Sequence, residues 1–428
     1  MNALDNLDTS IALPAETWCL IFEFATFVPG IFCTADGPAV VAFTHDRYNH
    51  CSSRRVRQSM NLKLVIGRVC SNWRSLVTHL LFECISIKNG RQALQLAELL
   101  RDTYPKSNFL DANAKTWWTK RIELVIDGVV LWTTEHTNAI IEVLQHCPNL
   151  VCFSTAFSSS DPYLIYTPSL ILALTKPGMK TKIKRLELKA TTALFYAIAM
   201  ELKSSLEVVW VLPSRRAPQK IALEKQELPK LHTFISGIQD GPCFDLPALQ
   251  ILVSCDTIER TSHIVRSGGT LQYLNMIDFG SSIPYLTLCP NLRTLLLGVH
   301  EITRLRSNNF LELSHLHIHT LIIECTNMFR LSLTGAGSDF VHRYLPALLS
   351  GFFLNVNFPA LKRIRFIFSE PDPITRLEPP PLTMLSSWRK WFEECHLQGI
   401  SIEVSYDIEQ LTSDLWVPLT LDLVQEHL

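Results

Sequence analysis

The feature that most constrains the fold of this chain is a leucine that returns at a nearly constant interval. Four units share one pattern, in which apolar residues follow the anchor leucine three and five positions later: Leu206/Val209/Val211, Leu271/Leu274/Met276, Leu292/Leu295/Leu297 and Leu361/Ile364/Phe366. Weaker units begin at Leu150, Ile183, Leu231, Leu249 and Ile318. From Ile183 to Leu292 the anchors lie 18 to 25 residues apart. This period predicts one short strand per unit, stacked in parallel on its neighbours.

Several units open with a similar phrase, in which a proline stands two residues before the anchor. The phrases are Cys147-Pro148-Asn149-Leu150, Leu246-Pro247-Ala248-Leu249, Cys289-Pro290-Asn291-Leu292 and Phe358-Pro359-Ala360-Leu361. They resemble the repeat starts of leucine-rich-repeat proteins, in which a short parallel strand follows each turn. The asparagine that commonly ends the strand in that family is missing from most units, so the repeat is degenerate. An ordinary α/β domain is the alternative, and both interpretations predict parallel strands covered by helices.

Two apolar helices are predicted upstream of the repeats, at residues 13–25 and 62–81. Apolar residues recur at helical spacing in both, and Pro14 suits the first turn of the first helix. Residues 27–60 between them lack sustained periodicity and hold two Pro and Gly pairs, Pro29-Gly30 and Gly37-Pro38. That composition predicts an irregular insertion.

The two predicted helices carry three short runs: Leu13-Pro14-Ala15-Glu16, Ile21-Phe22 and Val69-Cys70-Ser71-Asn72-Trp73-Arg74. Together they resemble the F-box, and the following Leu80-Leu81-Phe82-Glu83 resembles F-box proteins of basidiomycete fungi. A typical F-box has a short first connection, so the insertion is a departure, one shared by a fungal F-box-like subfamily. The resemblance implies an apolar ridge that docks on the Skp-family adaptor of cullin–RING ubiquitin ligases. It assigns that ridge to Leu13, Pro14, Ile21, Phe22, Val69, Cys70, Trp73 and Leu76.

The predicted fold class is therefore α/β, in three parts. An all-α, F-box-like module takes residues 11–87, with its insertion at about 27–60, and an irregular leucine-rich-repeat-like solenoid of parallel strands and helices takes 88–410. Residues 411–428 form a C-terminal tail. We expect the solenoid to hold a protein substrate on polar side chains that point outward between the buried anchors. The candidates are Gln272, Asn275, Lys362, Arg363 and Arg365.

Composition argues against several other classes of protein. The formal net charge of −1 lacks the positive field that nucleic-acid binding uses. The apolar run at 13–28 is interrupted by Pro14, Glu16 and Glu23, so we expect no membrane span. The 12 cysteines include no Cys-x-x-Cys pair, and no Asn-x-Ser/Thr acceptor occurs. These observations favour a reducing compartment, the cytoplasm or the nucleus.

Signals for catalysis are also missing from the sequence. It holds no phosphate-binding loop, nucleophile elbow or His-Glu-x-x-His helix. His315, His317 and His319 alternate and are expected on one face of a strand, as its polar face rather than as metal ligands. We therefore expect no catalytic residue, no metal and no cofactor. The favoured function is a non-catalytic substrate adaptor; a scaffold acting outside any ligase and an unrecognised α/β enzyme are the alternatives.

Overall fold

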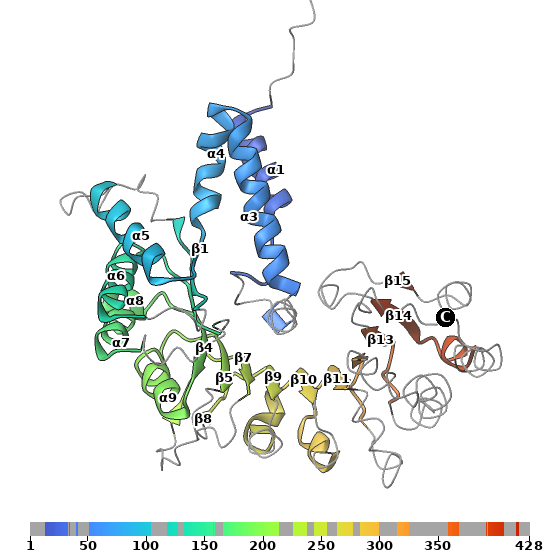
Figure 1. The fold of residues 1–428 in the computed structure, drawn as a ribbon. Helices are drawn as coiled ribbons and strands as arrows, with labels where there is room; N and C mark the ends of the chain where they lie inside the picture. The colour runs from blue at the N-terminus through green and yellow to red at the C-terminus, as the bar shows by residue number, and fades with distance from the viewer. Residues whose placement is uncertain are drawn as a thin grey trace, which may run out of the picture.

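The computed structural model describes most of the chain in segments. They are residues 13–32, 34, 40–41, 51–103, 118–126, 132–156, 158, 166–213, 226–237, 244–254, 263–276, 283–298, 315–324, 358–367, 391, 393–405 and 417–418. Parts of the predicted insertion, at 33, 35–39 and 42–50, lie outside the described residues, as does the predicted tail except for 417–418. The fold is mixed α/β and is built on one large sheet of parallel strands (Figure 1).

The strands of the main sheet stand side by side in the order in which the chain makes them. Neighbouring strands are parallel, except for the last pair, β14–β15, which is antiparallel. The order is β1 (Cys84–Ile87), β2 (Arg121–Leu124), β3 (Cys152–Ser154), β4 (Arg185–Ala190), β5 (Val208–Pro213), β7 (Thr233–Ser236), β9 (Ile251–Ser254), β10 (Tyr273–Met276), β11 (Thr294–Gly298), β12 (Thr320–Glu324), β13 (Arg363–Ile367), β14 (Ser401–Ser405) and β15 (Val417–Pro418). Two short strands, β6 (Gln226–Glu227) and β8 (Phe244–Asp245), pair separately.

Each anchor predicted from the sequence is buried, and a strand begins two residues after it. The turn before the anchor explains the proline. The amides of Leu150, Leu249 and Leu292 each donate to the carbonyl oxygen three residues earlier, which closes a β-turn. Proline therefore stands at the second position of that turn, where its fixed φ is favoured. The prediction of an α/β fold with parallel strands is confirmed.

Helices cover one face of the sheet along its N-terminal half, and farther on shorter helical stretches, at 263–267 and 393–397, and 3-10 turns follow. The covering elements are α5 (Gly90–Thr103), α6 (Thr134–Gln145), α7 (Pro168–Thr175), α8 (Pro177–Lys180), α9 (Thr192–Glu201), η4 (Gly268–Thr270) and η5 (Ile283–Leu288). Thr133, Thr167 and Thr191 cap α6, α7 and α9, because each side-chain oxygen accepts from an amide of the first turn. The main hydrophobic core lies between these elements and the sheet.

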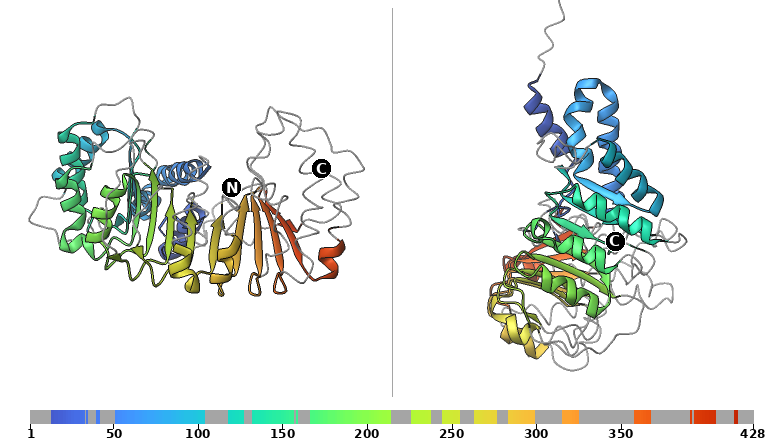
Figure 2. Two further views of the ribbon diagram at one scale, coloured as in Figure 1. Left: turned by 90° about the horizontal axis from the view of Figure 1, so that it is seen from below. Right: turned by 90° about the vertical axis from the view of Figure 1, so that its left-hand side faces the viewer.

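The row of strands is curved, with the covering helices outside the curve (Figure 2). We call the inner side the concave face. Since side chains alternate along a strand, the concave positions follow from the register of the strands. One row of them, from β2 to β14, is Glu123, Ser154, Glu187, Trp210, Ile235, Val253, Asn275, Leu296, Ile322, Arg365 and Glu403.

A separate group of helices precedes the sheet: α1 (Ala15–Thr26), α3 (Cys51–Val69) and α4 (Ser71–Phe82). We call it the helical module. The structure corrects two predictions here. The expected single helix at 62–81 is two helices, because Cys70 is extended, with φ −158° and ψ 171°. The insertion also ends earlier than expected, since α3 already begins at Cys51.

Among the described residues, no helix is both long enough and apolar enough to span a membrane.

Candidate protein-binding surfaces

The helical module is held together by an aromatic cluster. Trp18 and Phe22 of α1 meet Trp73 of α4, with ring centroids 4.7 Å apart for Trp18–Trp73 and 5.0 Å for Phe22–Trp73. Ile66, Val77 and Leu80 complete this small core, and Leu76 packs against it. Three of the residues predicted to bind the adaptor, Phe22, Trp73 and Leu76, therefore join the helices to one another.

The Val-Cys-x-x-Trp-Arg run forms the corner between α3 and α4. The Sγ of Cys70 accepts a hydrogen bond from the amide of Trp73, 3.4 Å away, and so caps α4. Arg74 Nε donates to the carbonyl oxygen of Gly67 at 3.0 Å, which ties α4 back to the end of α3. A Cβ on Gly67 would stand 3.2 Å from the side chain of Val77, so glycine permits the close approach of the two helices. The run thus supplies the cap of α4 (Cys70), a residue that packs on the core of the module (Trp73) and a side chain that holds α4 to the end of α3 (Arg74).

The other predicted adaptor-binding residues lie on the surface. Leu13, Pro14, Ile21, Val69 and Cys70 are exposed. Further exposed apolar side chains, not among the predicted adaptor-binding residues, are Leu20, Phe24, Leu62 and Val65, and Phe24 is 87% exposed. The signal that could have found them is their spacing, since 20 and 24 share one side of α1, and 62, 65 and 69 share one side of α3. We call this set of exposed apolar residues on α1 and α3, together with Leu13, the ridge.

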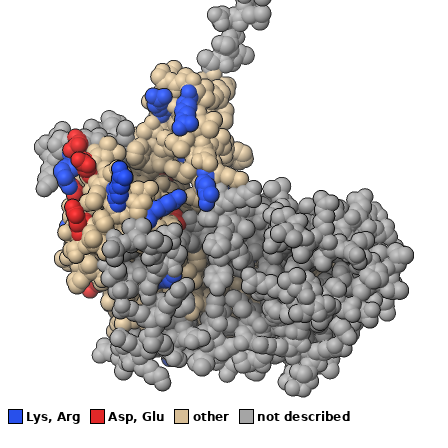
Figure 3. Space-filling view, viewed as in Figure 1, with Lys and Arg blue, Asp and Glu red and all other residues tan. Residues whose placement is uncertain are grey.

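Basic residues accompany the ridge. No Asp or Glu occurs between residues 51 and 82, whereas Arg57, Arg68 and Arg74 are exposed there. Figure 3 shows Lys and Arg side chains over the module and places a group of Asp and Glu over the side of α5 and α6. Charge of one sign around an apolar surface selects partners of the opposite sign. The exposed charges of α1 are instead Glu16 and Glu23, so only the part of the ridge on α3 favours a partner with an acidic rim.

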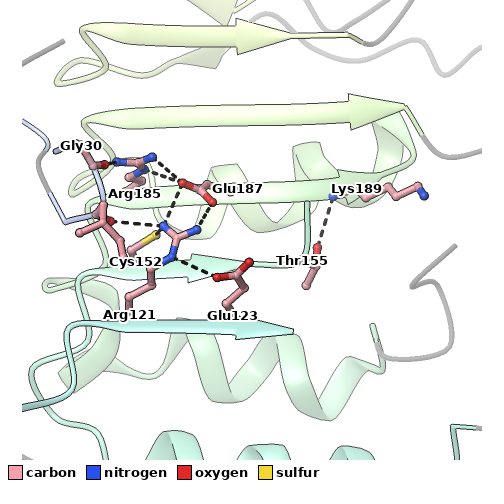
Figure 4. A network of polar contacts seen from close by, with 9 residues as sticks. Gly30, Arg121, Glu123, Cys152, Thr155, Arg185, Glu187 and Lys189 are labelled. Carbon is pink, nitrogen blue, oxygen red and sulfur yellow. Dashed lines mark hydrogen bonds and ion pairs between the residues drawn. The ribbon is translucent and has the colours of Figure 1, made fainter. Parts of the chain in front are cut away.

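The N-terminal end of the concave face carries a buried cluster of charges (Figure 4). Glu187 accepts hydrogen bonds from both Arg121 and Arg185, and the side chains of all three are fully buried. Glu123 lies next to Arg121, at 3.7 Å. Burial raises the pKa of the Cys152 thiol to about 12, so at neutral pH it stays a thiol that accepts from Arg121 at 2.9 Å. Two arginines and two glutamates leave this cluster without net charge.

This charged cluster also holds the segment that follows α1. Arg185 donates to the carbonyl oxygen of Gly30, and Arg121 Nη1 donates to that of Ile31 at 3.4 Å. The start of the predicted insertion is therefore fixed on the concave face by hydrogen bonds to its backbone.

Beyond this cluster the concave face becomes apolar. The residues are Val208, Trp210, Ile235, Ile251, Val253, Tyr273, Leu296 and Ile322, which we call the apolar strip. Val40 and Val41 pack in the same cluster, and all of these residues are buried. The structure thus places part of the predicted insertion on the face where polar, exposed side chains were expected.

The five predicted substrate-binding residues fall into three groups. Gln272 and Lys362 are exposed, but each lies just before a strand rather than within it. Arg363 and Arg365 lie on the concave side of β13, where Arg365 donates to Glu403 at 2.7 Å. The expected exposure of Asn275 is wrong: it is 0% exposed in the middle of the apolar strip. Whether these residues bind a substrate stays a prediction.

The three alternating histidines also differ from expectation, because they precede β12 instead of lying on it. His315 is buried, with Nε2 2.8 Å from the carbonyl oxygen of Cys289. In the part of the chain that the structure describes, no group of three His, Cys, Asp or Glu residues is placed to hold a metal ion.

Comparison of the chain with protein-family models and with curated proteins finds no match.

Proposed function

We propose that this chain is a substrate-recognition adaptor of a cullin–RING ubiquitin ligase. The helical module is F-box-like and binds a Skp-family adaptor through the ridge. The sheet and its covering helices form a leucine-rich-repeat-like solenoid, which holds the protein to be ubiquitinated. Catalysis belongs to other subunits of the ligase, and this chain raises the effective concentration of the substrate beside them.

The single observation that carries the proposal is the ridge. The helical module already has a buried core, yet it leaves large apolar side chains of α1 and α3 in solvent. Exposed apolar patches on a folded protein are typical of binding sites, and helical spacing gathers these residues on one side of α1 and on one side of α3. An apolar helix face that enters a groove on a partner is a common mode of recognition. The Leu-Pro and Val-Cys-x-x-Trp-Arg runs, which resemble the F-box, stand at the start of α1 and at the corner between α3 and α4.

The direct test measures the affinity of the full chain for a purified Skp-family adaptor. Leu13 and Ile21 are 39% and 40% exposed, so a partner has less than half of each side chain left to cover. Replacing both by alanine is expected to weaken binding by about 10- to 50-fold. Phe24→Ala is expected to have a comparable effect by itself. The matched control is Leu172→Ala on α7, because Leu172 is 65% exposed but outside the module.

Two outcomes contradict the proposal. If the ridge variants keep their melting temperature and bind the adaptor as tightly as the Leu172→Ala control, the ridge is not the docking surface. If the adaptor binds but the reconstituted ligase, with this chain included, transfers no ubiquitin to any protein that this chain captures, the chain is a scaffold outside the ligase.

A further inference from the structure

One position of each repeat unit forms a row along the edge of the sheet where the strands begin. It is the residue directly after the anchor, and backbone hydrogen bonds stack it on the same position of the neighbouring unit. The amide of Arg293 donates to the carbonyl oxygen of Gln272, that of His319 to Arg293, and that of Lys362 to His319. Neighbouring strands lie about 4.8 Å apart, so adjacent side chains of this row can contact the same group.

In the N-terminal part of this row, basic residues are neutralised by acidic neighbours within the row. The Nζ of Lys184 lies 2.8 Å from Oε1 of Glu207, which occupies the next position. The Nζ of Lys120 lies 2.7 Å from Oε1 of Glu83, which occupies the position before. Adjacent positions of the row are thus close enough for their charged ends to form ion pairs.

The C-terminal part of the row holds basic residues without an acidic neighbour in the row. Arg293, His319 and Lys362 stand at three successive positions, and Arg363 follows at the start of β13. All four side chains are exposed, and we call them the basic row. Within the part of the chain that the structure describes, neither Arg293 nor Lys362 has an ion pair. Like charges side by side are unfavourable, and a partner of opposite charge relieves that repulsion.

The acidic residues nearby do not neutralise the basic row. The carboxylate of Glu403 accepts from Arg365 Nε at 2.7 Å and lies 4.0 Å from Arg363 Nε, so two arginines share one negative charge. Glu324 stands at the far end of β12, about 13 Å along the strand from its first residue. The two glutamates of the helical stretch 393–397 lie on the covering side, where that stretch packs on the main core. The basic row therefore keeps its positive charge in the free protein.

We propose that the basic row binds an acidic segment of the protein substrate, whose neighbouring Asp or Glu carboxylates lie against Arg293, Lys362 and Arg363. A guanidinium can donate two parallel hydrogen bonds to one carboxylate, and the ammonium adds a compact positive charge. The formal net charge of −1 on the whole chain lacks the field that a nucleic acid uses, so this local charge fits a polypeptide better. The inference rests on the proposed function, of which it names the substrate class.

The test measures the binding of the full chain to a fluorescein-labelled peptide that carries a run of Asp and Glu between Gly-Ser ends. The matched control peptide has Asn and Gln in place of these acidic residues, so that it keeps the length and the shape but loses the charge. At near-physiological ionic strength, the acidic peptide is expected to bind at least about tenfold more tightly than the control peptide.

The triple variant Arg293→Gln/Lys362→Gln/Arg363→Gln removes the charges of the basic row. It is expected to bind the acidic peptide about 10- to 50-fold more weakly than the wild-type chain does. Because the three side chains are exposed, the melting temperature is expected to stay the same.

A second triple variant, Lys176→Gln/Lys182→Gln/Lys203→Gln, is the matched control. It removes the same number of positive charges from exposed lysines beside α8 and α9, on the covering side of the sheet. Its affinity for the acidic peptide is expected to stay within about twofold of wild type, since exposed charges farther away than a Debye length are largely screened.

The proposal is overturned if the folded variant of the basic row binds the acidic peptide as tightly as the control variant does. It is equally overturned if a single-stranded oligothymidylate of the same net charge competes as well as the acidic peptide, because the surface would then bind any polyanion. The assay contains no adaptor. A chain that binds the acidic peptide through the basic row but binds no Skp-family protein would keep this binding site and lose the proposed function. A chain that binds the adaptor but not the acidic peptide would lose only this inference.

Discussion

Glu187 is the residue on which the buried charges of the concave face depend, and Glu187→Gln tests that dependence. Its carboxylate accepts from Arg121 at 3.0 Å and from Arg185 at 2.7 Å, with no solvent contact. Glutamine keeps the size of the side chain but removes one negative charge. The cluster of two arginines and two glutamates then carries an uncompensated positive charge in the interior.

The expected loss of unfolding free energy is about 3–5 kcal/mol, the cost of removing one partner from a buried ion pair. That is a large share of the roughly 5–15 kcal/mol by which folded domains are stable. Glu201→Gln is the matched control, because Glu201 pairs with Lys180 at 3.1 Å while its side chain is 56% exposed. An exposed pair contributes less than about 1 kcal/mol.

Urea denaturation of both variants measures the difference. Glu187→Gln is expected to lower the midpoint by roughly 1–2 M, and Glu201→Gln by a few tenths at most. If the two variants shift the midpoint equally, the buried cluster does not stabilise the fold and the reasoning fails. Protease cleavage within residues 28–34 gives a second readout, since loss of Glu187 loosens the arginines that hold this segment.

Two further predictions concern the cap of α4 and the pH dependence of stability. Cys70→Ser should raise the unfolding free energy by about 0.5–1 kcal/mol in thermal denaturation, because serine is a better N-cap; a lower melting temperature would show that the thiol is needed for packing. Burial lowers the pKa of His315, so the unfolded chain takes up a proton below pH of about 6.5 while the folded chain does not. The stability present above that pH is therefore lost as pH falls. His315→Gln keeps a donor for the Cys289 carbonyl and should make the loss of unfolding free energy between pH 7 and 5 smaller. An unchanged dependence of the unfolding free energy on pH would refute this role.

The strands could be predicted from the sequence because their signals are local. In several units a proline in the turn and a leucine at its end mark where the strand begins, and in the others the apolar anchor alone marks it. The break between α3 and α4 at Cys70 is harder to predict from the sequence than the strands are. A cysteine rarely caps a helix, and apolar residues continue at helical spacing on both sides of Cys70. The early start of α3 was missed because the basic run at 52–57 hides the periodicity.

The two candidate surfaces could be predicted only in part. On the module, helical spacing gave the apolar residues, but whether Phe22 or Ile21 points inward depends on where α3 and α4 lie. On the concave face, strand alternation correctly placed Arg363, Arg365 and Asn275 away from the anchors. The burial of Asn275 depends on packing between distant parts of the chain, and no local pattern reports that.

The hydrogen bond from Arg185 to the carbonyl oxygen of Gly30 has a consequence for folding during synthesis. Each strand pairs with a neighbour from the next unit, so the sheet can grow as the chain leaves the ribosome. The contact between Gly30 and Arg185 instead spans 155 residues. At about 5–20 residues per second, Arg185 is synthesised roughly 8–30 s after Gly30. During that interval the nascent segment with its two valines has no place to dock, which makes it a site for chaperones to bind.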